Sequence, residues 1–298
     1  MKRLLVTGAT GLLGSALVRA AASRYEVHGL ARHPEAAPIA CATHAADLTA
    51  ADAVARVVAD IEPDVVVHTA AFTHVDGCER DPDAARRQNV QATANVVRAL
   101  ASAPARVLHV STDAVFDGTR GGYTETDTPA PLSVYSRTKL EAEHVVRGAR
   151  PDALIARTVF SGWNALPKQS LGEWVLGRLR GGANVPGFVD VRFSPLFADT
   201  LARVLLDLAE TPAAGVLHVG SRDGCSKFDF ARMVAAAFGY PEARVVPTRS
   251  DDVPLVAPRA RDLTLDVARA EAELRRALPT VAQDVAAFAA AAPTAVTA

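Results

Sequence analysis

The sequence predicts an α/β protein with a doubly wound parallel sheet and a smaller C-terminal lobe. From residue 3 to residue 160, short apolar runs alternate with segments of helical spacing, as in βαβ units with right-handed crossovers. After residue 160 this alternation stops. We therefore expect a sheet unit from residues 1–160 and about 196–220, a lobe from 161–195 and 221–291, and a disordered tail over 292–298.

Composition excludes several classes of function. The 298 residues carry a net charge of −1, which does not favour binding to nucleic acid or to an anionic membrane. No apolar run approaches the roughly 18–20 residues of a membrane helix, and no signal peptide precedes the first strand, so we expect a cytoplasmic protein without a membrane partner. The three cysteines are far apart, which suggests neither a disulfide framework nor a metal site.

A glycine motif follows the first predicted strand, residues 3–7. Gly8, Gly11 and Gly14 have the spacing G-x-x-G-x-x-G and lead into a predicted helix over residues 12–23. Such glycines permit a tight turn, close approach of a pyrophosphate and close packing of helix on strand. The free N–H groups of the helix then favour an anion. The pattern indicates a dinucleotide site; the alternative is a plain turn rich in glycine.

The next two strands bear on which dinucleotide is bound. The strand over residues 26–31 ends at Arg32, with no acidic residue there, and this favours NADP(H) over NAD(H), which stays open. The alternative is that Arg32 is a solvated loop residue. Asp47 ends the third strand, where it or Thr49 caps the helix over residues 50–60, or where it contacts the adenine edge.

The strand within residues 63–71 is rich in valine and is expected to be buried on both faces. His68 interrupts it and is interpreted as a core histidine with a satisfied hydrogen bond. Ala70 and Ala71 are small residues at the end of this strand, where a cofactor would pass closely. A helix over 82–102 and a strand over 105–112, ending in Ser111 and Thr112, come next.

Tyr135 and Lys139 lie four residues apart on a helix predicted from residue 134, and therefore share a face. A tyrosine with a free pKa of about 10 serves as a general acid when a nearby cation stabilises its phenolate. Thr112 is placed to orient a carbonyl. The three residues predict a proton-donating site beside a hydride donor; the alternative is that they are surface residues.

The second half offers fewer signals. Predicted helices cover residues 170–181, 198–210 and 227–238, a strand at 215–220 returns to the sheet, residues 190–195 are irregular, and one closing helix lies near 266–291. Trp163 is either a core aromatic or a stacking platform for a base or sugar. The arginines that could clamp a diphosphate are Arg178, Arg180, Arg192 and Arg259.

Taken together, these motifs resemble the dTDP-4-dehydrorhamnose reductase family of extended short-chain dehydrogenase/reductases, in which the sheet unit is of the Rossmann type. The most specific match is the segment Ser111-Thr112-Asp113-Ala114-Val115-Phe116-Asp117-Gly118, which is similar to S-T-D-Y-V-F-D-G of the family. The glycine motif, the segment from Ala70 to Asp76, Tyr135-x-x-x-Lys139 and Arg157-Thr158 also match.

The resemblance implies NADPH-dependent reduction of the keto group of a nucleotide-linked 4-keto-6-deoxy sugar, with Tyr135 as the proton donor, Thr112 polarising the carbonyl and Lys139 supporting Tyr135. The implied cofactor-binding residues are Gly8, Thr10, Gly11, Leu12, Leu13, Gly14, Arg32, Asp47, Leu48, Ala70, Ala71, Phe72, Tyr135 and Lys139. The implied substrate-binding residues are Thr73, Val75, Ala114, Phe116, Trp163, Asn164, Arg192 and Arg259. No metal is implied, and a homodimer is left open.

Some residues depart from the family pattern. Ala114 and Phe72 stand where tyrosine is common, and Ala257-Pro258-Arg259-Ala260 lacks the asparagine of the late R-P-x-N segment. These departures leave the identity of the sugar open. Two other functions are weighed: a non-catalytic NAD(P)-binding subunit like the regulatory subunit of methionine adenosyltransferase, and a sugar-nucleotide epimerase that holds NAD tightly.

Overall fold

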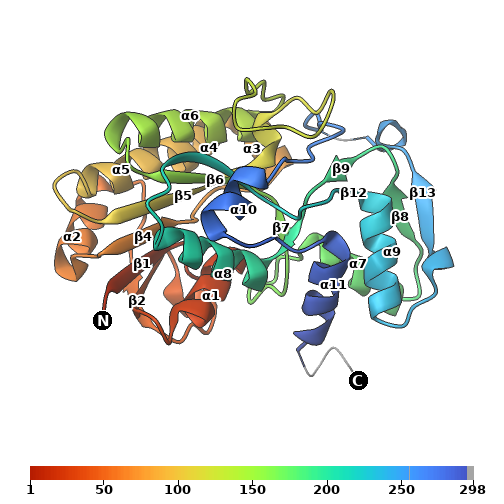
Figure 1. Cartoon of the computed structure of the whole chain (residues 1–298), viewed down its shortest axis with the longest axis horizontal. Helices are drawn as coiled ribbons and strands as arrows, with labels where there is room; N and C mark the ends of the chain where they lie inside the picture. Colours follow the sequence, from red (N-terminus) through yellow and green to blue (C-terminus); the bar gives the residue numbers. More distant parts are fainter. Residues whose placement is uncertain (255, 294–298) are drawn as a thin grey trace.

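A seven-stranded parallel sheet with the order β11-β6-β5-β4-β1-β2-β3 forms the centre of the computed structural model, which describes residues 1–254 and 256–293 (Figure 1). The strands are β1 (Arg3–Thr7), β2 (Glu26–Ala31), β3 (Ala42–Ala45), β4 (Val65–His68), β5 (Arg106–Thr112), β6 (Leu154–Thr158) and β11 (Gly215–Val219). The direction of winding reverses between β1 and β4, and ligands of such sheets bind at the carboxyl ends of the strands beside this reversal. The predicted fold class is confirmed.

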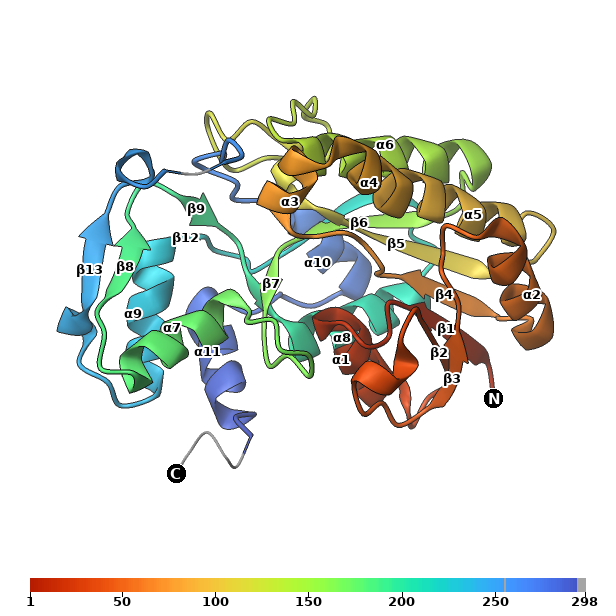
Figure 2. The same ribbon diagram turned by 180° about the vertical axis from the view of Figure 1, so that it is seen from behind.

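Helices cover both faces of the sheet (Figures 1 and 2). One layer contains α1 (Leu12–Ala21), α8 (Ala198–Ala209) and α10 (Ala268–Leu274); the other contains α2 (Ala51–Ile61), α5 (Ala92–Ala99) and α6 (Val134–Ala149). The valine run of β4 explains this arrangement. Val65 and Val67 point into the apolar core between the sheet and the layer of α1 and α8, which we call the first core. Val66 points into the core on the other face, under α2 and α5, so the strand buries apolar side chains on both faces.

The second lobe has an apolar core of its own, formed largely by aromatic and branched side chains such as Phe193, Phe230 and Phe288. Its helices are α7 (Leu171–Arg180), α9 (Lys227–Ala237) and α11 (Val281–Ala290). Its short strands pair as β8 (Val185–Phe188) with β13 (Val245–Thr248), β9 (Arg192–Phe193) with β12 (Cys225–Ser226), and β7 (Phe160–Ser161) with β10 (Leu196–Phe197).

Three expectations about the elements were wrong, and a fourth was incomplete. The helix expected over 82–102 is present over 82–99 as α4 (Pro82–Arg86), a π-helical turn (Arg87–Gln91) and α5 in succession, and α3 (Val75–Arg80) precedes it unforeseen. The irregular stretch 190–195 contains β9. The closing helix is two helices, because Arg275 adopts a left-handed conformation that ends α10 and Pro279 follows. Neither Asp47 nor Thr49 caps α2, whose N-cap is Ala50.

The first core also contains Leu265, Val267, Ala270 and Leu278, which the predicted boundaries assign to the second lobe. The chain therefore crosses back to the sheet unit before it ends in α11. Residues 294–298 of the expected disordered tail lie outside the described residues. Short 3₁₀ helices complete the secondary structure at Pro34–Ala36, Asp113–Val115, Glu242–Arg244 and Ser250–Asp252.

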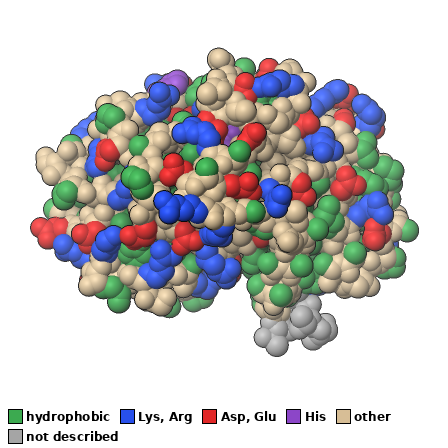
Figure 3. Space-filling model, viewed as in Figure 1, with side chains coloured by type: hydrophobic (Ala, Val, Ile, Leu, Met, Phe, Trp, Pro, Cys, Tyr) green, Lys and Arg blue, Asp and Glu red, His purple; other side chains and the backbone are tan. Residues whose placement is uncertain are grey.

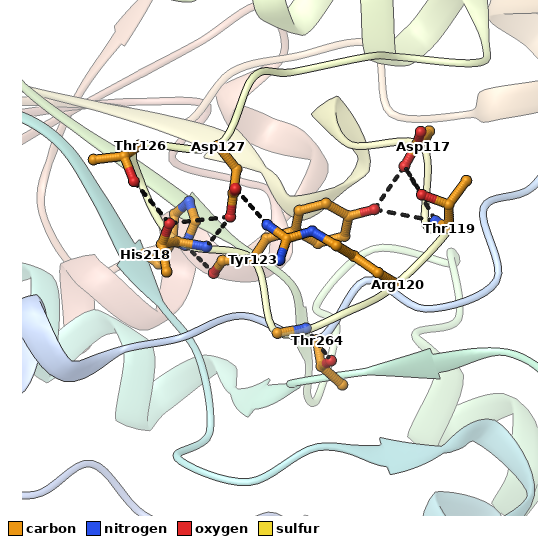
Figure 4. Close-up of polar contacts among 10 residues, drawn as sticks. Asp117, Thr119, Arg120, Tyr123, Thr126, Asp127, His218 and Thr264 are labelled. Atoms are coloured by element: carbon orange, nitrogen blue, oxygen red, sulfur yellow. Dashed lines mark hydrogen bonds and ion pairs between the residues drawn. The ribbon is translucent and has the colours of Figure 1, made fainter.

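The polar loop over residues 117–132 is tied to its surroundings by hydrogen bonds (Figure 4). The Tyr123 hydroxyl donates to Asp117 Oδ1 at 2.6 Å, and the Tyr123 backbone N–H donates to the Thr264 carbonyl at 2.9 Å. The carbonyl of Tyr123 lies 3.0 Å from His218 Nδ1 at the end of β11. The loop is thus fixed between the sheet and the segment that returns from the second lobe.

On the face shown in Figure 3, basic and acidic side chains are interspersed rather than gathered by sign. Within residues 1–254 and 256–293, no helix is both long and apolar enough to cross a membrane.

Candidate functional site

A cavity of about 540 Å³ lies at the carboxyl ends of β1, β4 and β5, where the winding of the sheet reverses. It is lined from one side by the sheet unit and from the other by the loop that leads into α7. All but one of the predicted cofactor-binding residues line it, the exception being Phe72.

The glycine loop forms the floor of one part of this cavity. Gly8 has a φ of +69°, and a Cβ atom there would come within 2.9 Å of the Ala70 backbone, which follows β4. A Cβ atom on Gly14 would lie 2.1 Å from the Gly8 carbonyl oxygen. No side chain caps the N-terminus of α1, so its first-turn N–H groups at Leu12 and Leu13, which line the cavity, are available to an anion. The loop fits the pyrophosphate of a dinucleotide.

Tyr135, Lys139 and Thr112 line the same cavity. Tyr135 and Lys139 lie in the first half of α6, whose N-cap Ser133 accepts a hydrogen bond from the Ser136 N–H. Lys139 is buried; its Nζ donates to the Val110 carbonyl at 2.8 Å and lies 3.5 Å from His109 Nε2. Thr112 ends β5, the strand beside α6. The structure thus brings together three residues that are 27 positions apart at most, on adjoining elements.

Burial shifts the pKa values of the ionisable side chains beside Thr112. It raises the pKa of Tyr135, against which a hydrogen bond with Thr112 acts, so the phenol is neutral at rest. Burial lowers the pKa of Lys139 to about 8, and the nearby Glu143 carboxylate opposes this shift. Asp113, next to Thr112 and accepting its hydroxyl at 3.1 Å, has its pKa raised to about 7, again by burial.

A buried polar network supports these residues from behind. His68 Nδ1 lies 2.7 Å from Thr7 Oγ1 and its Nε2 lies 3.0 Å from Thr93 Oγ1, so the interpretation of His68 as a satisfied core histidine is confirmed. In the π-helical turn, Asn89 accepts from the Phe72 N–H and donates to Thr138 on α6. The network connects Phe72, in the loop after β4, to the helix that carries Tyr135.

Arg32 and Asp47 face each other at the end of the cavity formed by β2 and β3. Arg32 Nε lies 3.2 Å from Asp47 Oδ2, and both side chains are about half exposed. The other carboxylate oxygen of Asp47 accepts from the N–H and hydroxyl of Thr49 at 2.8 Å each. These hydrogen bonds are the first cause, with Arg32 contributing, of a lowered pKa for Asp47.

The substrate-binding residues implied by the motifs are less concentrated. Thr73 and Asn164 line the cavity, whereas the other six are not among the described residues that do. Val75 begins α3, beyond Thr73, and Ala114 lies in the 3₁₀ turn after Thr112. Their roles stay predictions.

Two aromatic residues lie elsewhere than expected. Phe116 is fully buried, stacked on Tyr123 with ring centroids 4.1 Å apart, so it supports the loop over 117–132 and does not line the pocket. Trp163 stacks on Phe288 at 4.3 Å, and its Nε1 donates to the Phe288 carbonyl at 3.0 Å. This contact favours the interpretation of Trp163 as a core aromatic over that of a stacking platform.

The proposed arginine clamp is not assembled at the cavity either. Arg192 pairs with Asp262 at 3.5 Å and Arg259 pairs with Asp76 at 2.7 Å. Arg178 donates to the Asn184 carbonyl and lies over the Trp174 ring. None of the four arginines belongs to the described lining of the cavity.

The cavity contains residues that the sequence analysis missed. Phe160 and Val159 follow β6, and the rule that ligands bind at the carboxyl ends of strands could have identified them. Lys168 and Gln169 belong to the loop before α7, and Gln88 to the π-helical turn. No local motif marks these three.

Comparison with known proteins agrees with this geometry. The chain is 35% identical to a probable low-salt glycan biosynthesis reductase of Haloferax volcanii, over 96% of this chain and 97% of that protein. It is 36% identical to a dTDP-4-dehydrorhamnose reductase of Mycobacterium tuberculosis, over 87% of this chain and 83% of that protein. It is 32% identical to the methionine adenosyltransferase 2 subunit beta of Bos taurus, over 91% and 82%.

Among solved structures, the chain is similar to a dTDP-4-dehydrorhamnose reductase of Bacillus anthracis in complex with NADP, with a TM-score of 0.86 and 25% identity over 97% of this chain and 99% of that one. The family described as the RmlD substrate binding domain matches residues 1–293. The predicted resemblance is confirmed, and the chain belongs to the RmlD substrate-binding family of sugar-nucleotide reductases and their relatives.

Proposed function

We propose that this chain uses NADPH to reduce the keto group of a nucleotide-linked 4-keto-6-deoxy sugar. The observation that carries the proposal is the presence of Thr112, Tyr135 and Lys139 in the same cavity as the glycine loop. The relatives support the substrate class, since the Mycobacterium tuberculosis and Bacillus anthracis proteins are both named dTDP-4-dehydrorhamnose reductases.

The residues present fit a dinucleotide. The glycine loop and the uncapped N-terminus of α1 suit its pyrophosphate, and Ala70 and Ala71 leave room beside the strand ends. Arg32 suits the 2′-phosphate of NADP(H), and the Bacillus anthracis structure supports this choice because it is an NADP complex. When bound, the reduced nicotinamide supplies the electron pair and the hydrogen that the keto carbon receives.

The side chains of this protein complete the reaction. Tyr135 donates its phenolic proton to the keto oxygen as negative charge develops there, and Thr112 hydrogen-bonds the same oxygen. The Lys139 ammonium, held by the Val110 carbonyl, stabilises the phenolate that remains. A phenol that is neutral at rest, as burial makes Tyr135, is the form required of an acid.

The test is turnover of NADPH, followed by its absorbance, with a panel of 4-keto-6-deoxy sugar nucleotides. Replacing Tyr135 by phenylalanine should lower kcat by about 10²–10⁴-fold, since general acid catalysis contributes about that much. The affinity for NADPH should stay within about twofold, because the aromatic ring remains. Tyr240→Phe, the same change in the second lobe, is the matched control. Turnover that survives Tyr135→Phe would contradict the assigned acid.

A regulatory role is the second candidate, because the relatives include several named methionine adenosyltransferase 2 subunit beta. It predicts no turnover with any keto sugar and a stoichiometric protein partner in a pull-down. The set of Thr112, Tyr135 and Lys139 favours the reductase, because a pure binding protein has no chemical need for a tyrosine and a buried lysine that line the same cavity.

A further inference from the structure

Lys168 is a cation that the second lobe contributes to the cavity. It lies in the loop between β7 and α7 and lines the cavity together with Asn164 and Gln169. Its Nζ donates a 2.6 Å hydrogen bond to Thr73 Oγ1, in the loop that follows β4. The side chain therefore spans from the second lobe to the sheet unit beside the cavity.

The loop that carries Lys168 is held in place by its own hydrogen bonds. Ser170 and Glu173 form a capping box at the start of α7, and the same Glu173 carboxylate accepts from the Asn164 N–H at 2.9 Å. The Lys168 N–H donates to the Leu166 carbonyl at 2.7 Å. The ammonium is thus presented by an ordered turn, which reduces the entropy lost when it binds a ligand.

The other charged groups of the cavity already have partners. Arg32 faces Asp47, and Lys139 donates to a backbone carbonyl. Among the described residues, Lys168 has no carboxylate within ion-pair distance, and its one hydrogen-bond partner is a neutral hydroxyl. Two of its three N–H donors therefore remain for an anion. A compact ammonium of this kind suits phosphate oxygens.

The position of Lys168 distinguishes between the anions that enter the cavity. Lys168 enters the cavity from the loop that leads into α7, on the other side of the cavity from the glycine loop. Thr73, its partner, follows the strand end at Ala70 and Ala71. The pyrophosphate of the cofactor has a separate site at Leu12 and Leu13, in the first turn of α1.

We propose that Lys168 binds the diphosphate of the sugar nucleotide and, held by Thr73, selects substrates that carry one. The proposal deepens the proposed function and rests on it for the substrate class. It assigns to the second lobe a specificity-determining cation that none of the four candidate arginines supplies at the cavity.

The test measures binding of dTDP, UDP and GDP to the NADP-loaded protein by calorimetry. Lys168→Met should weaken the tightest of the three by about 10–100-fold, the range for a hydrogen bond to a charged group, and should leave the affinity for NADPH within about twofold. Lys168→Arg should recover most of the loss. Lys2→Met serves as the control. It removes the same charge at the amino ends of the strands, away from the cavity, where Lys2 pairs with Glu210.

Each other outcome is decisive. Equal weakening of NADPH and the nucleoside diphosphate would assign Lys168 to the cofactor and overturn the proposal. Wild-type protein that binds none of the three diphosphates would overturn it as well. Failure of the proposed function gives a different result. The protein would then not turn over keto sugars, while Lys168→Met would still weaken binding of the nucleoside diphosphate. Turnover with unchanged binding in Lys168→Met leaves the reductase and refutes the role of Lys168.

Discussion

The glycine loop and the second lobe line the same cavity, but different kinds of interaction position them. On the side of the sheet unit, the cavity wall is backbone: Gly8 and Gly14 approach Ala70 and each other so closely that a Cβ atom would not fit. On the other side, the wall is a loop held by side-chain contacts: the hydrogen bonds of Glu173 and the stacking of Trp163 on Phe288, 125 residues away.

This difference decides what each side tolerates. A wall of close backbone contacts has no room for adjustment, whereas an aromatic cluster can be repacked by a residue of similar volume. The proposed cofactor site and the proposed proton donor lie on the rigid side, and Lys168, the proposed determinant of substrate choice, lies on the adaptable one.

The largest expected effect is on the rigid side. Gly14→Ala should weaken NADPH binding by about 100-fold or more, equivalent to about 3 kcal/mol, because its Cβ would lie 2.1 Å from the Gly8 carbonyl oxygen and the loop must move. Fluorescence titration with NADPH measures this. Gly148→Ala in α6, where a Cβ would meet nothing within 4 Å, should leave binding unchanged and stabilise the helix by about 1 kcal/mol. Normal NADPH affinity in Gly14→Ala would remove the contrast between the two walls.

The same contrast explains what the sequence could predict. The glycine loop, Tyr135 and Lys139 lie within continuous elements whose spacing determines their geometry. Strand alternation likewise predicted the sheet, including the return of β11 to it. Lys168 could not be found, because its place depends on a hydrogen bond to Thr73, 95 residues earlier.

One motif match assigned more residues to the cavity than the structure places there. The segment from Ser111 to Gly118 was the most specific match, yet only its first two residues, Ser111 and Thr112, line the cavity. In its second half, Phe116 stacks on Tyr123 and Asp117 accepts from the Tyr123 hydroxyl, so these residues shape a loop. A recurring motif contains residues that line the site and residues that stabilise the fold, and residue spacing alone does not tell the two kinds apart.

On the adaptable side, Trp163→Ala should lower the free energy of unfolding by about 3 kcal/mol, because it empties the stack on Phe288. Trp163→Phe should cost less than about 1.5 kcal/mol, since a similar ring refills the space. Urea denaturation measures both, and the affinity of the folded variants for NADPH should not change. A fall in kcat/KM without loss of stability in Trp163→Phe would instead support the stacking-platform role.

A smaller effect is expected at the end of the cavity where a side chain, Arg32, and not backbone is proposed to bind the cofactor. Arg32→Ala should weaken NADPH by about tenfold, one lost charge-assisted contact, and leave NADH within about twofold. Arg19→Ala is the matched control, since Arg19 is an exposed arginine paired with Asp199 outside the cavity lining. Equal loss for both cofactors would mean that Arg32 does not read the 2′-phosphate.

The last test asks whether water reaches the interior behind Lys139, and it measures a slope against pH and not a single loss. Burial lowers the pKa of His109 well below its unfolded value, so below about pH 6.5 the unfolded chain takes up a proton that the folded chain does not. Its contribution to stability is complete above that pH and is lost as the pH falls, at about 1.4 kcal/mol per pH unit.

His109→Phe should reduce the slope of unfolding free energy against pH by that amount between pH 6 and 4. Part of the slope that remains comes from His68, whose pKa burial lowers to about 3. Urea denaturation across that range measures the slope. His33→Gln, at an exposed position, should leave it unchanged. An unaltered slope in His109→Phe would mean that water reaches the space behind Lys139, and that the lysine is not held in the dry environment that its contact with His109 Nε2 indicates.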